Sequence, residues 1–254
     1  MSDDHFVQRI AKFGTYDAWL FDLDGVITGT SMLHAAAWQQ MFNSFLSAWA
    51  QRSRAPFQPF EINPDYYRYV DGKPRYEGVA AFLQSRNIIV ARGKPSDSPA
   101  LETICGLGNR KNHTFNELLH RQGANVYPDS INLLTQLRRA GHAIAVVTSS
   151  RNCATVLKSA GLDTMFDTQI DGISAAAEGL AGKPAPDTFL AAAQQLGVAA
   201  EQCVVIEDAV AGVQAGRNGG FGLVIGVARN CEPELLRAGG ADLVVANLNE
   251  LELN

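Results

Sequence analysis

The chain has 254 residues and 46% hydrophobic composition, which is enough to bury one large core or a core and a smaller second domain. Its formal net charge is -5 and its lysines and arginines form no basic block, so we expect no nucleic-acid partner. No apolar run approaches the roughly 20 residues that span a bilayer, and the start, Met1 to His5, lacks the features of a signal peptide. The four cysteines form no metal-type or redox pair, so we expect reduced thiols in a cytoplasmic protein without a membrane partner.

The chain begins its regular structure with a predicted buried strand, Tyr16 to Phe21, and from Tyr127 onward apolar runs alternate with helical patterns. The further predicted strands are Ala143–Val147, Phe166–Ile170, Cys203–Ile206, Gly222–Val227 and Leu243–Val245. The predicted helices around them are Pro128–Ala140, Asn152–Ala160, Asp187–Leu196, Val210–Arg217 and Glu232–Ala238. Apolar strands separated by helices indicate an α/β fold with a doubly wound parallel sheet, whose ligands gather beyond the carboxyl ends of the strands.

The stretch from residue 30 to 126 interrupts this alternation. It contains three helical patterns and a loop rich in Pro, Gly and Ser, namely Ser31–Ala50, Arg75–Arg86, Asn112–Gln122 and Ala91–Pro99. We therefore predict a catalytic core made of residues 1–29 and 127–254, and an inserted α-helical cap domain, residues 30–126, that determines substrate specificity.

The strongest chemical motif follows the first strand and reads Asp22-Leu23-Asp24-Gly25-Val26-Ile27-Thr28. Two carboxylates two residues apart can face one cleft, where one attacks phosphorus and the other moves the proton of the exchanged oxygen. The simpler interpretation is an ordinary Asp-Gly turn after a strand. A calcium-binding EF-hand is not expected, because Leu33 stands where that loop requires Glu.

Two more motifs are suited to holding phosphate. Val147-Thr148-Ser149-Ser150 places hydroxyl and backbone N–H groups at a strand end, although such residues also serve simply as a helix cap. Lys183 lies in Gly182-Lys183-Pro184-Ala185-Pro186-Asp187 and could place a positive charge against a phosphoryl oxygen, or be a solvated loop lysine.

The fourth motif is Val204-Val205-Ile206-Glu207-Asp208, in which two carboxylates end a buried strand. Mg²⁺ takes oxygen ligands of this kind, while the alternative is that Asp208 caps the next helix. Each simple interpretation is reasonable by itself. Four carboxylates, a lysine and a hydroxyl cluster, all at strand ends, together match what metal-assisted phosphoryl transfer requires.

These four segments resemble the haloacid dehalogenase superfamily of phosphatases and phosphomutases, and most of all its β-phosphoglucomutase group. The resemblance implies that Asp22 is the nucleophile and Asp24 the general acid–base. The Mg²⁺ ligands that it implies are Asp22, the backbone carbonyl of Asp24, Glu207 and Asp208. The residues implied to hold the transferring phosphoryl group are Thr148, Ser149 and Lys183.

The inserted stretch is similar to the same group at the segments Leu33–Trp38, Gly72–Arg75 and Arg110–Asn112. The likeness implies that Arg75 grips the phosphate remote from the metal, as does the loop Ser150-Arg151-Asn152. It also implies that His34, Lys111 and Asn112 orient the sugar or assist Asp24; surface charges and a histidine on a helix face are the plain alternatives. The chain departs from the group at Gly29-Thr30 and in a longer cap around Gln51–Pro64 and Ile88–Glu102.

The sequence thus predicts a monomeric, Mg²⁺-dependent enzyme that transfers a phosphoryl group of a small phosphorylated sugar through an aspartyl-phosphate. The first hypothesis is a β-phosphoglucomutase, which interconverts β-glucose 1-phosphate and glucose 6-phosphate, because a mutase must hold two phosphates. The second is a sugar-phosphate phosphatase of the same fold. The third is a catalytically silent binding protein, which would lack the nucleophile, the acid or the lysine, and none of these is missing.

Overall fold

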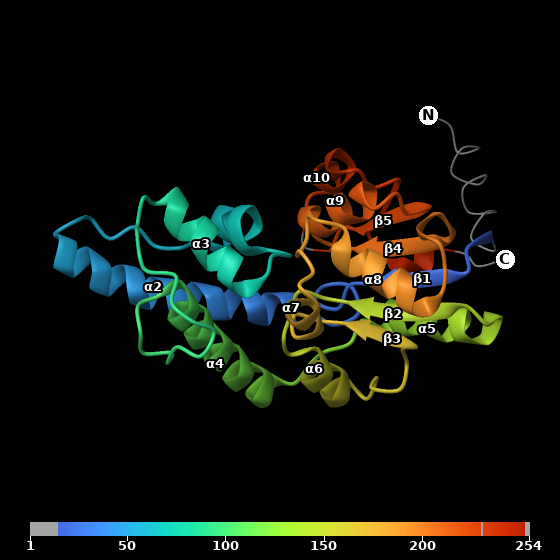
Figure 1. Cartoon of the computed structure of the whole chain (residues 1–254), viewed down its shortest axis with the longest axis horizontal. Coiled ribbons are helices and arrows are strands. Elements are labelled where there is room, and N and C mark those ends of the chain that lie inside the picture. The colour runs from blue at the N-terminus through green and yellow to red at the C-terminus, as the bar shows by residue number, and fades with distance from the viewer. Residues whose placement is uncertain (1–14, 230, 252–254) are drawn as a thin grey trace. The chain divides into compact units, whose positions relative to one another are not determined.

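The computed structural model describes residues 15–229 and 231–251, and the chain start compared above with a signal peptide, Met1 to His5, lies outside them. The chain forms two compact units, described separately below. The core unit consists of Met1–Gly29 and Asn125–Asn254, and the helical unit of Thr30–Ala124 (Figure 1). Among the described residues, no helix combines the length and apolar character needed to cross a membrane.

The core unit contains one six-stranded parallel sheet with the strand order β3-β2-β1-β4-β5-β6 (Figure 1). Its strands are β1 (Ala18–Phe21), β2 (Ala143–Val147), β3 (Thr168–Ile170), β4 (Cys203–Glu207), β5 (Leu223–Val227) and β6 (Leu243–Val245). The order reverses between β1 and β4, which is the switch point where such sheets bind ligands. The predicted doubly wound α/β fold is confirmed.

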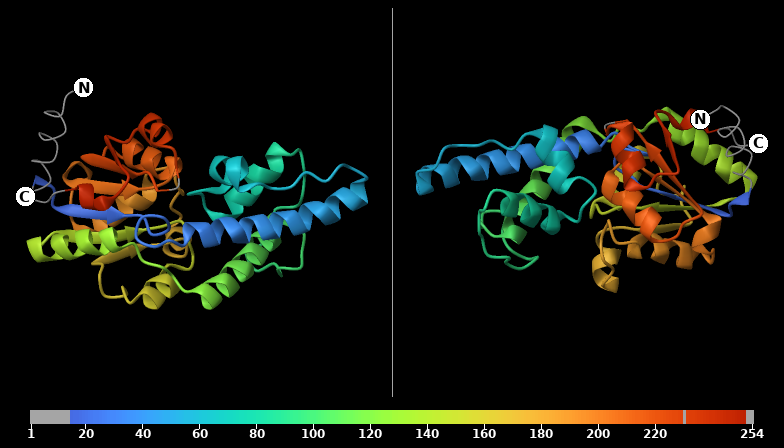
Figure 2. Two further views of the ribbon diagram at one scale, coloured as in Figure 1. Left: turned by 180° about the vertical axis from the view of Figure 1, so that it is seen from behind. Right: turned by 90° about the horizontal axis from the view of Figure 1, so that it is seen from above.

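Helices lie on both faces of this sheet (Figure 2). They are α5 (Pro128–Ala140), α6 (Cys153–Ala160), α7 (Ser174–Glu178), α8 (Asp187–Leu196), α9 (Val210–Asn218) and α10 (Pro233–Gly239), with short turns η3 (Ala200–Gln202) and η4 (Leu248–Glu250). Leu20 and Val205 point to one face and pack with Phe189 of α8 and Val213 of α9. Helix α5 packs against β2. Because both faces are covered, the central strands β1, β2 and β5 are apolar along their whole length, and β4 is apolar up to Glu207 at its end. The short strand β3 at the edge of the sheet contains Thr168 and Gln169.

Strand register places the chemical motifs together. Phe21 at the end of β1 pairs with Val146 of β2 on one side and with Ile206 of β4 on the other. The residues that follow in each strand, Asp22 and Glu207 among them, therefore emerge at the same edge of the sheet.

The helical unit has its own hydrophobic core. Its elements are α2 (Ser31–Ser53), η2 (Ile62–Val70), α3 (Arg75–Ser85) and α4 (Ile104–Gln122). Aromatic side chains dominate the core, and Phe42 contacts the rings of Trp38, Phe60 and Phe82 at centroid distances of 5.4, 5.0 and 4.3 Å. Buried aromatic pairs of this kind let a small unit bury a large apolar area.

Helix α4 begins at Ile104, so the predicted start at Asn112 is wrong. The extra turns contain Gly106 and Gly108, which disfavour a helix in isolation. Here both are required by close packing, since a Cβ atom at Gly106 would lie 2.4 Å from the Leu101 carbonyl oxygen and one at Gly108 would lie 2.8 Å from the ring of Tyr76. The side chain of Thr103 accepts a hydrogen bond from the Gly106 amide and caps the helix.

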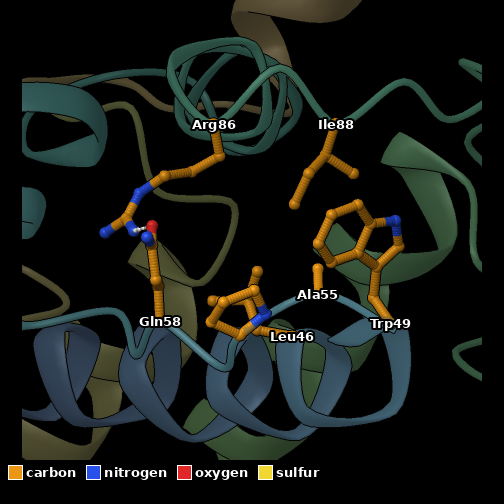
Figure 3. Close-up of a pocket in the computed structure, with 7 residues that line it drawn as sticks. Leu46, Trp49, Ala55, Gln58, Arg86 and Ile88 are labelled. Atoms are coloured by element: carbon orange, nitrogen blue, oxygen red, sulfur yellow. Dashed lines mark hydrogen bonds between the residues drawn. The ribbon is translucent and has the colours of Figure 1, made fainter. Parts of the chain in front are cut away.

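The helical unit also contains a pocket of about 160 Å³ (Figure 3). Its lining residues are Leu46, Trp49, Ala55, Pro56, Gln58, Arg86 and Ile88. Arg86 donates to Gln58 (3.0 Å) and pairs with Asp65 (2.9 Å). None of the lining residues is a predicted site residue, and several belong to the segments that lengthen the cap.

Candidate active site

Asp22 is the first residue after β1 and is held by its backbone, whose amide donates to the Ile206 carbonyl oxygen of β4 at 2.9 Å. The residue is 7% exposed. Burial raises the pKa of Asp22 well above its ordinary value, and the charge of Lys183 only partly offsets this effect. A further positive charge beside Asp22 would stabilise the ionised form of this buried carboxylate.

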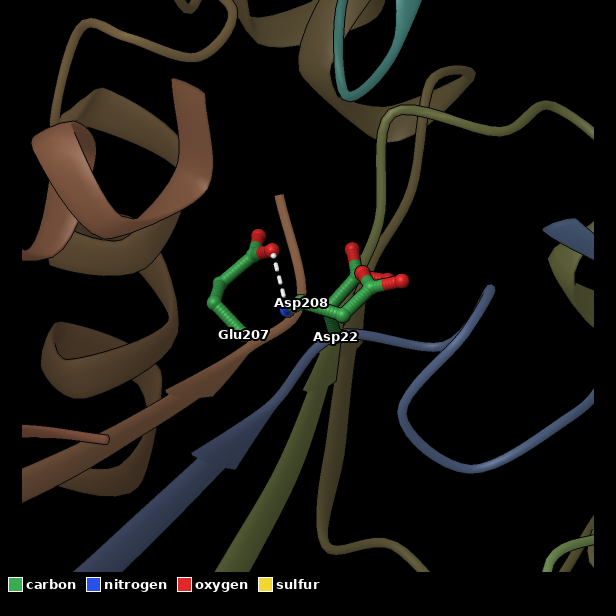
Figure 4. A group of neighbouring side chains, drawn as sticks. All are labelled: Asp22, Glu207 and Asp208. Carbon is green, nitrogen blue, oxygen red and sulfur yellow. Dashed lines mark hydrogen bonds between the residues drawn. The ribbon is translucent and has the colours of Figure 1, made fainter. Parts of the chain in front are cut away.

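Three buried carboxylates meet at the ends of β1 and β4. Asp22, Glu207 and Asp208 each offer an oxygen atom, and these atoms all lie within 4.8 Å of one another. Figure 4 shows the carboxyl groups of Asp22 and Asp208 side by side, while Glu207 accepts a hydrogen bond from the Asp208 amide. This all-oxygen donor set fits Mg²⁺, which prefers carboxylates and keeps several waters.

Glycines make room for this cluster. Gly25 has φ +103°, and a Cβ atom there would lie 1.8 Å from a carboxylate oxygen of Asp208. A Cβ atom at Gly212, in α9, would lie 1.8 Å from a carboxylate oxygen of Glu207. Both positions require glycine, because the carboxylates occupy the space that a side chain needs.

Lys183 is the cation of the cluster and is 2% exposed. Its Nζ donates to Asp22 Oδ1 (2.6 Å), Glu207 Oε1 (2.5 Å) and the Val147 carbonyl oxygen (3.0 Å). Burial acts to lower the pKa of Lys183, but the charges of Asp22 and Glu207 outweigh it and raise the pKa above its ordinary value. The ammonium group therefore stays charged, and one positive charge faces three carboxylates.

The hydroxyl cluster follows β2 and leads into α6. Thr148 Oγ1 donates to Asp24 Oδ2 at 3.3 Å, which links this loop to the one after β1. The same hydroxyl accepts from the Ser150 amide (3.0 Å), and the Ser150 hydroxyl accepts from the Asn152 amide (3.2 Å). These bonds fold the loop back on itself. The N-cap residue of α6, Asn152, makes no side-chain capping hydrogen bond, so the simpler interpretation of these residues as a Ser/Thr helix cap is wrong. Thr148 is buried, while Ser149 and Arg151 are half-buried.

The predicted site residues of the helical unit fall into two groups. Lys111 on α4 is 4% exposed and forms a hydrogen bond with His34 Nδ1 of α2. The His34 ring stacks on Phe115 at 3.9 Å, and Lys111 lies 5.1 Å from the rings of both Trp38 and Phe115. The two predicted residues therefore share one aromatic environment, and the ammonium group of Lys111 lies within cation–π distance of two rings. Asn112 follows Lys111 and is half-buried.

Arg75, the second group, begins α3 and donates to Asn109 Oδ1 at 3.4 Å. Asn109 also accepts from Tyr76 (2.9 Å) and donates to the carbonyl oxygens of Pro95 and Asp97 (3.0 and 2.9 Å). Asn109 thus connects Arg75 to the loop between α3 and α4. The sequence analysis did not single it out, although it directly precedes the Arg-Lys-Asn segment.

The structure brings together Asp22, Lys183, Glu207 and Asp208, and it joins Asp24 to Thr148. Within the helical unit it joins His34 to Lys111 and places Arg75 on the neighbouring helix. Buried carboxylates around a lysine, at the carboxyl edge of a parallel sheet, define the chain as an enzyme of the phosphoryl-transfer class.

The sequence profile of the haloacid dehalogenase-like hydrolases matches residues 16–220. The chain belongs to this family. A beta-phosphoglucomutase of Mycobacterium tuberculosis (strain CDC 1551 / Oshkosh) is 47% identical over 237 residues, which cover 92% of this chain and 90% of that protein. A beta-phosphoglucomutase of Bacillus subtilis (strain 168) is 31% identical, covering 93% and 92%. The crystal structure of a beta-phosphoglucomutase from Clostridium difficile superimposes with a TM-score of 0.72 at 28% identity and covers 94% of both chains.

Proposed function

We propose that this chain is a β-phosphoglucomutase, which interconverts β-glucose 1-phosphate and glucose 6-phosphate. The observation that carries the proposal is the likeness, over nine-tenths of both chains, to a protein named beta-phosphoglucomutase at 47% identity. The substrate class is a small phosphorylated sugar, and a cytoplasmic location and a monomeric state accompany the proposal as predictions.

In this proposal Asp22 attacks phosphorus and carries the phosphoryl group as an aspartyl-phosphate. Asp22 Oδ1 is held by Lys183, which fixes the carboxylate before the reaction and stays beside the transferring group. Asp22, Glu207, Asp208 and the Asp24 carbonyl oxygen would hold Mg²⁺, which when bound would neutralise charge on the phosphoryl oxygens.

Asp24 is proposed to move the proton of the sugar hydroxyl. Its carboxylate accepts a hydrogen bond from Thr148, so that Oδ2 is oriented by the loop that would also hold phosphate. Thr148 and Ser149 are proposed to hold the transferring phosphoryl group, and Ser150, Arg151 and Asn152 to help hold the second phosphate.

Arg75, His34, Lys111 and Asn112 are proposed to bind the sugar and the phosphate remote from the metal. The observation that supports this role is the joint placement of His34 and Lys111 on packed helices, with Arg75 on the adjacent one. The proposed cap role of residues 30–126 depends on these four residues.

A phosphatase of the same fold is the second candidate, because the matching family is described as hydrolases. One mixture separates the two: the protein, β-glucose 1-phosphate, Mg²⁺ and a bisphosphate primer. The mutase predicts that glucose 6-phosphate appears, and the α anomer of the substrate is the matched control. Free phosphate without glucose 6-phosphate would refute the mutase and support the phosphatase.

The variant Asp22→Asn tests the nucleophile. An amide attacks phosphorus far more weakly than a carboxylate, so we expect turnover to fall by at least about 10³-fold. Asp163→Asn, a change at an exposed aspartate, is the matched control and should keep full activity. Activity of Asp22→Asn equal to that of the control would show that Asp22 does not carry the phosphoryl group.

A further inference from the structure

The two chain segments that connect the units lie together on the core unit. Thr28 pairs with Val126 in an antiparallel bridge. The Gly29 amide donates to the Asn125 carbonyl oxygen (2.8 Å), and the Tyr127 amide donates to that of Ile27 (3.0 Å). The outgoing segment, residues 26–29, and the returning segment, residues 125–127, therefore form a short two-stranded ribbon, which we call the linker ribbon.

Arg229, two residues beyond β5, contacts both segments of the linker ribbon. Its Nη2 donates to Asp129 Oδ2 (2.7 Å), to Ser130 Oγ (3.2 Å) and to the Val26 carbonyl oxygen (3.5 Å). Ser130 itself donates to the same Val26 oxygen at 2.6 Å. The guanidinium carbon of Arg229 lies 3.8 Å from the centre of the Tyr127 ring. One side chain thus joins the sheet to both segments.

The ion pair between Arg229 and Asp129 is buried, so the desolvation of its two charges offsets much of what it contributes to stability. The side chains of Arg229 and Asp129 are 10% and 4% exposed. Arg229 Nε is buried and has no hydrogen-bond partner among the described residues. Buried ion pairs often contribute no more to stability than apolar residues of the same size, and the better-attested benefit is a fixed geometry.

The geometry that Arg229 fixes belongs to the loop with the candidate catalytic carboxylates. Val26 lies two residues after Asp24, and the Gly25 amide donates to the Thr28 carbonyl oxygen at 2.7 Å. A displacement of the linker ribbon therefore also displaces Asp24, unless a contact with the rest of the core unit holds the ribbon in place. Relative movement of two domains of one chain is the default expectation unless a large apolar interface joins them.

We propose that Arg229 is a positioning residue that fastens the linker ribbon at Val26 and Tyr127, so that movement between the units bends the chain outside the ribbon and leaves Asp22 and Asp24 in place. Only the consequence for turnover rests on the proposed function. The fastening itself is a property of the core unit and is measured without substrate.

Hydrogen exchange tests the fastening. Arg229→Met keeps the approximate length of the side chain and removes the guanidinium group. Because this change leaves the buried carboxylate of Asp129 without a counter-charge, a double variant that also carries Asp129→Asn is made beside it. In both we expect the amides of Gly29 and Tyr127 to exchange at least about tenfold faster, while the amides of β4 change by less than about twofold. Unchanged linker amides in the folded double variant would overturn the proposal.

The matched control is Arg217→Met, which removes an arginine that is 66% exposed and lies 3.8 Å from Asp242 in the same unit. It should leave the linker amides unchanged; equal acceleration in this variant would overturn the specific role of Arg229.

Kinetics separate positioning from mere stability. Well below the unfolding temperature, displaced carboxylates should lower kcat of the double variant about tenfold with KM within about twofold of the parent. A lower melting temperature with unchanged kcat would refute positioning. If the parent chain transfers no phosphoryl group, the proposed function fails, and the exchange experiment still decides the fastening.

Discussion

At the scale of single residues, Lys183 balances the acid cluster. Its ammonium group contacts two of the three buried carboxylates and the end of β2. A buried pair of this kind is expensive to break, because removing one partner leaves a charge without compensation. The same residue therefore serves the stability of the core unit and the proposed chemistry.

Lys183→Met should make this dual role measurable. The loss of the cation leaves Asp22 and Glu207 repelling each other in a buried site, so we expect the free energy of unfolding in the absence of divalent ions to fall by about 3–5 kcal/mol. Added Mg²⁺ should restore part of the loss, since a ligand that binds only the folded state stabilises it. Urea unfolding with and without Mg²⁺ measures both effects, and equal stability of variant and parent would contradict the first.

At the scale of elements, two glycines leave the space that the cluster of Asp22, Glu207 and Asp208 occupies. Gly25 directly follows Asp24 in the loop after β1, and Gly212 lies in α9, against Glu207. The helix can approach the end of β4 only because position 212 has no side chain. The cluster is therefore built as much by the backbone of α9 as by the carboxylates themselves.

Gly212→Ala should displace Glu207. The new Cβ atom would lie 1.8 Å from the carboxylate oxygen, so the side chain or the helix must move. Overpacking of this kind costs about 1–3 kcal/mol, and we expect weaker Mg²⁺ binding besides. Thermal unfolding and a Mg²⁺ titration measure the two effects. Gln214→Ala, at an exposed position of the same helix, is the control. If the Gly212 variant is as stable as this control and binds Mg²⁺ as well, Glu207 is not displaced by the added methyl group.

Asp167 gives a prediction about pH. It accepts hydrogen bonds from the Ile144 amide (2.8 Å) and from Arg138 (2.7 and 2.9 Å), joining the start of β2 to the end of α5. Partial burial acts to raise the pKa of Asp167, but these hydrogen bonds and the charge of Arg138 lower it below its ordinary value of 3.8. Its stabilising contribution is therefore complete above that value and is lost as the pH falls through the lower value of the folded state.

Asp167→Asn should accordingly destabilise the protein at pH 7 by about 1 kcal/mol or less, because the pair is partly exposed and screened by solvent. The difference from the parent should shrink below pH 4. Urea unfolding at pH 7 and pH 3 measures it, with Asp163→Asn as the control. A difference that grows on acidification would contradict the sign of the pKa shift.

The sequence predicted the core unit better than the helical unit. Strands β1, β2 and β4 are short apolar runs that end in polar residues, and this local signal placed Asp22, Thr148 and Glu207 at one edge of the sheet. The early turns of α4 were not predicted, because Gly106 is unfavourable for a helix until Leu101 packs against it. Helices η2 and α7 were also not predicted. Such tertiary contacts are invisible to patterns in neighbouring residues.

At the scale of the whole molecule, the helical unit is an insertion with a separate core. The aromatic cluster of α2, η2 and α3 is buried within it, and the sheet of the core unit is complete without it. Each unit thus has the internal packing that a domain needs.

Replacement of residues 30–124 by a short Gly-Ser linker should leave a folded core unit, because Gly29 and Asn125 are already hydrogen-bonded to each other. Circular dichroism and a cooperative thermal transition measure folding. We expect the shortened protein to hydrolyse a small aryl phosphate and to lose selectivity among sugar phosphates, since the proposed sugar-binding residues are removed. Unchanged sugar selectivity would contradict the specificity role of the helical unit.

The adjacency of Gly29 and Asn125 also bears on how such a chain diversifies. An insertion whose two ends are neighbouring residues has a loop-closure cost that rises only slowly with its length. A single event of genetic exchange between these two codons could therefore replace one inserted unit by another of different size, while the carboxylates and the lysine at the edge of the sheet remain unaltered. New substrate preferences would then arise by recombination rather than by gradual change around the carboxylates.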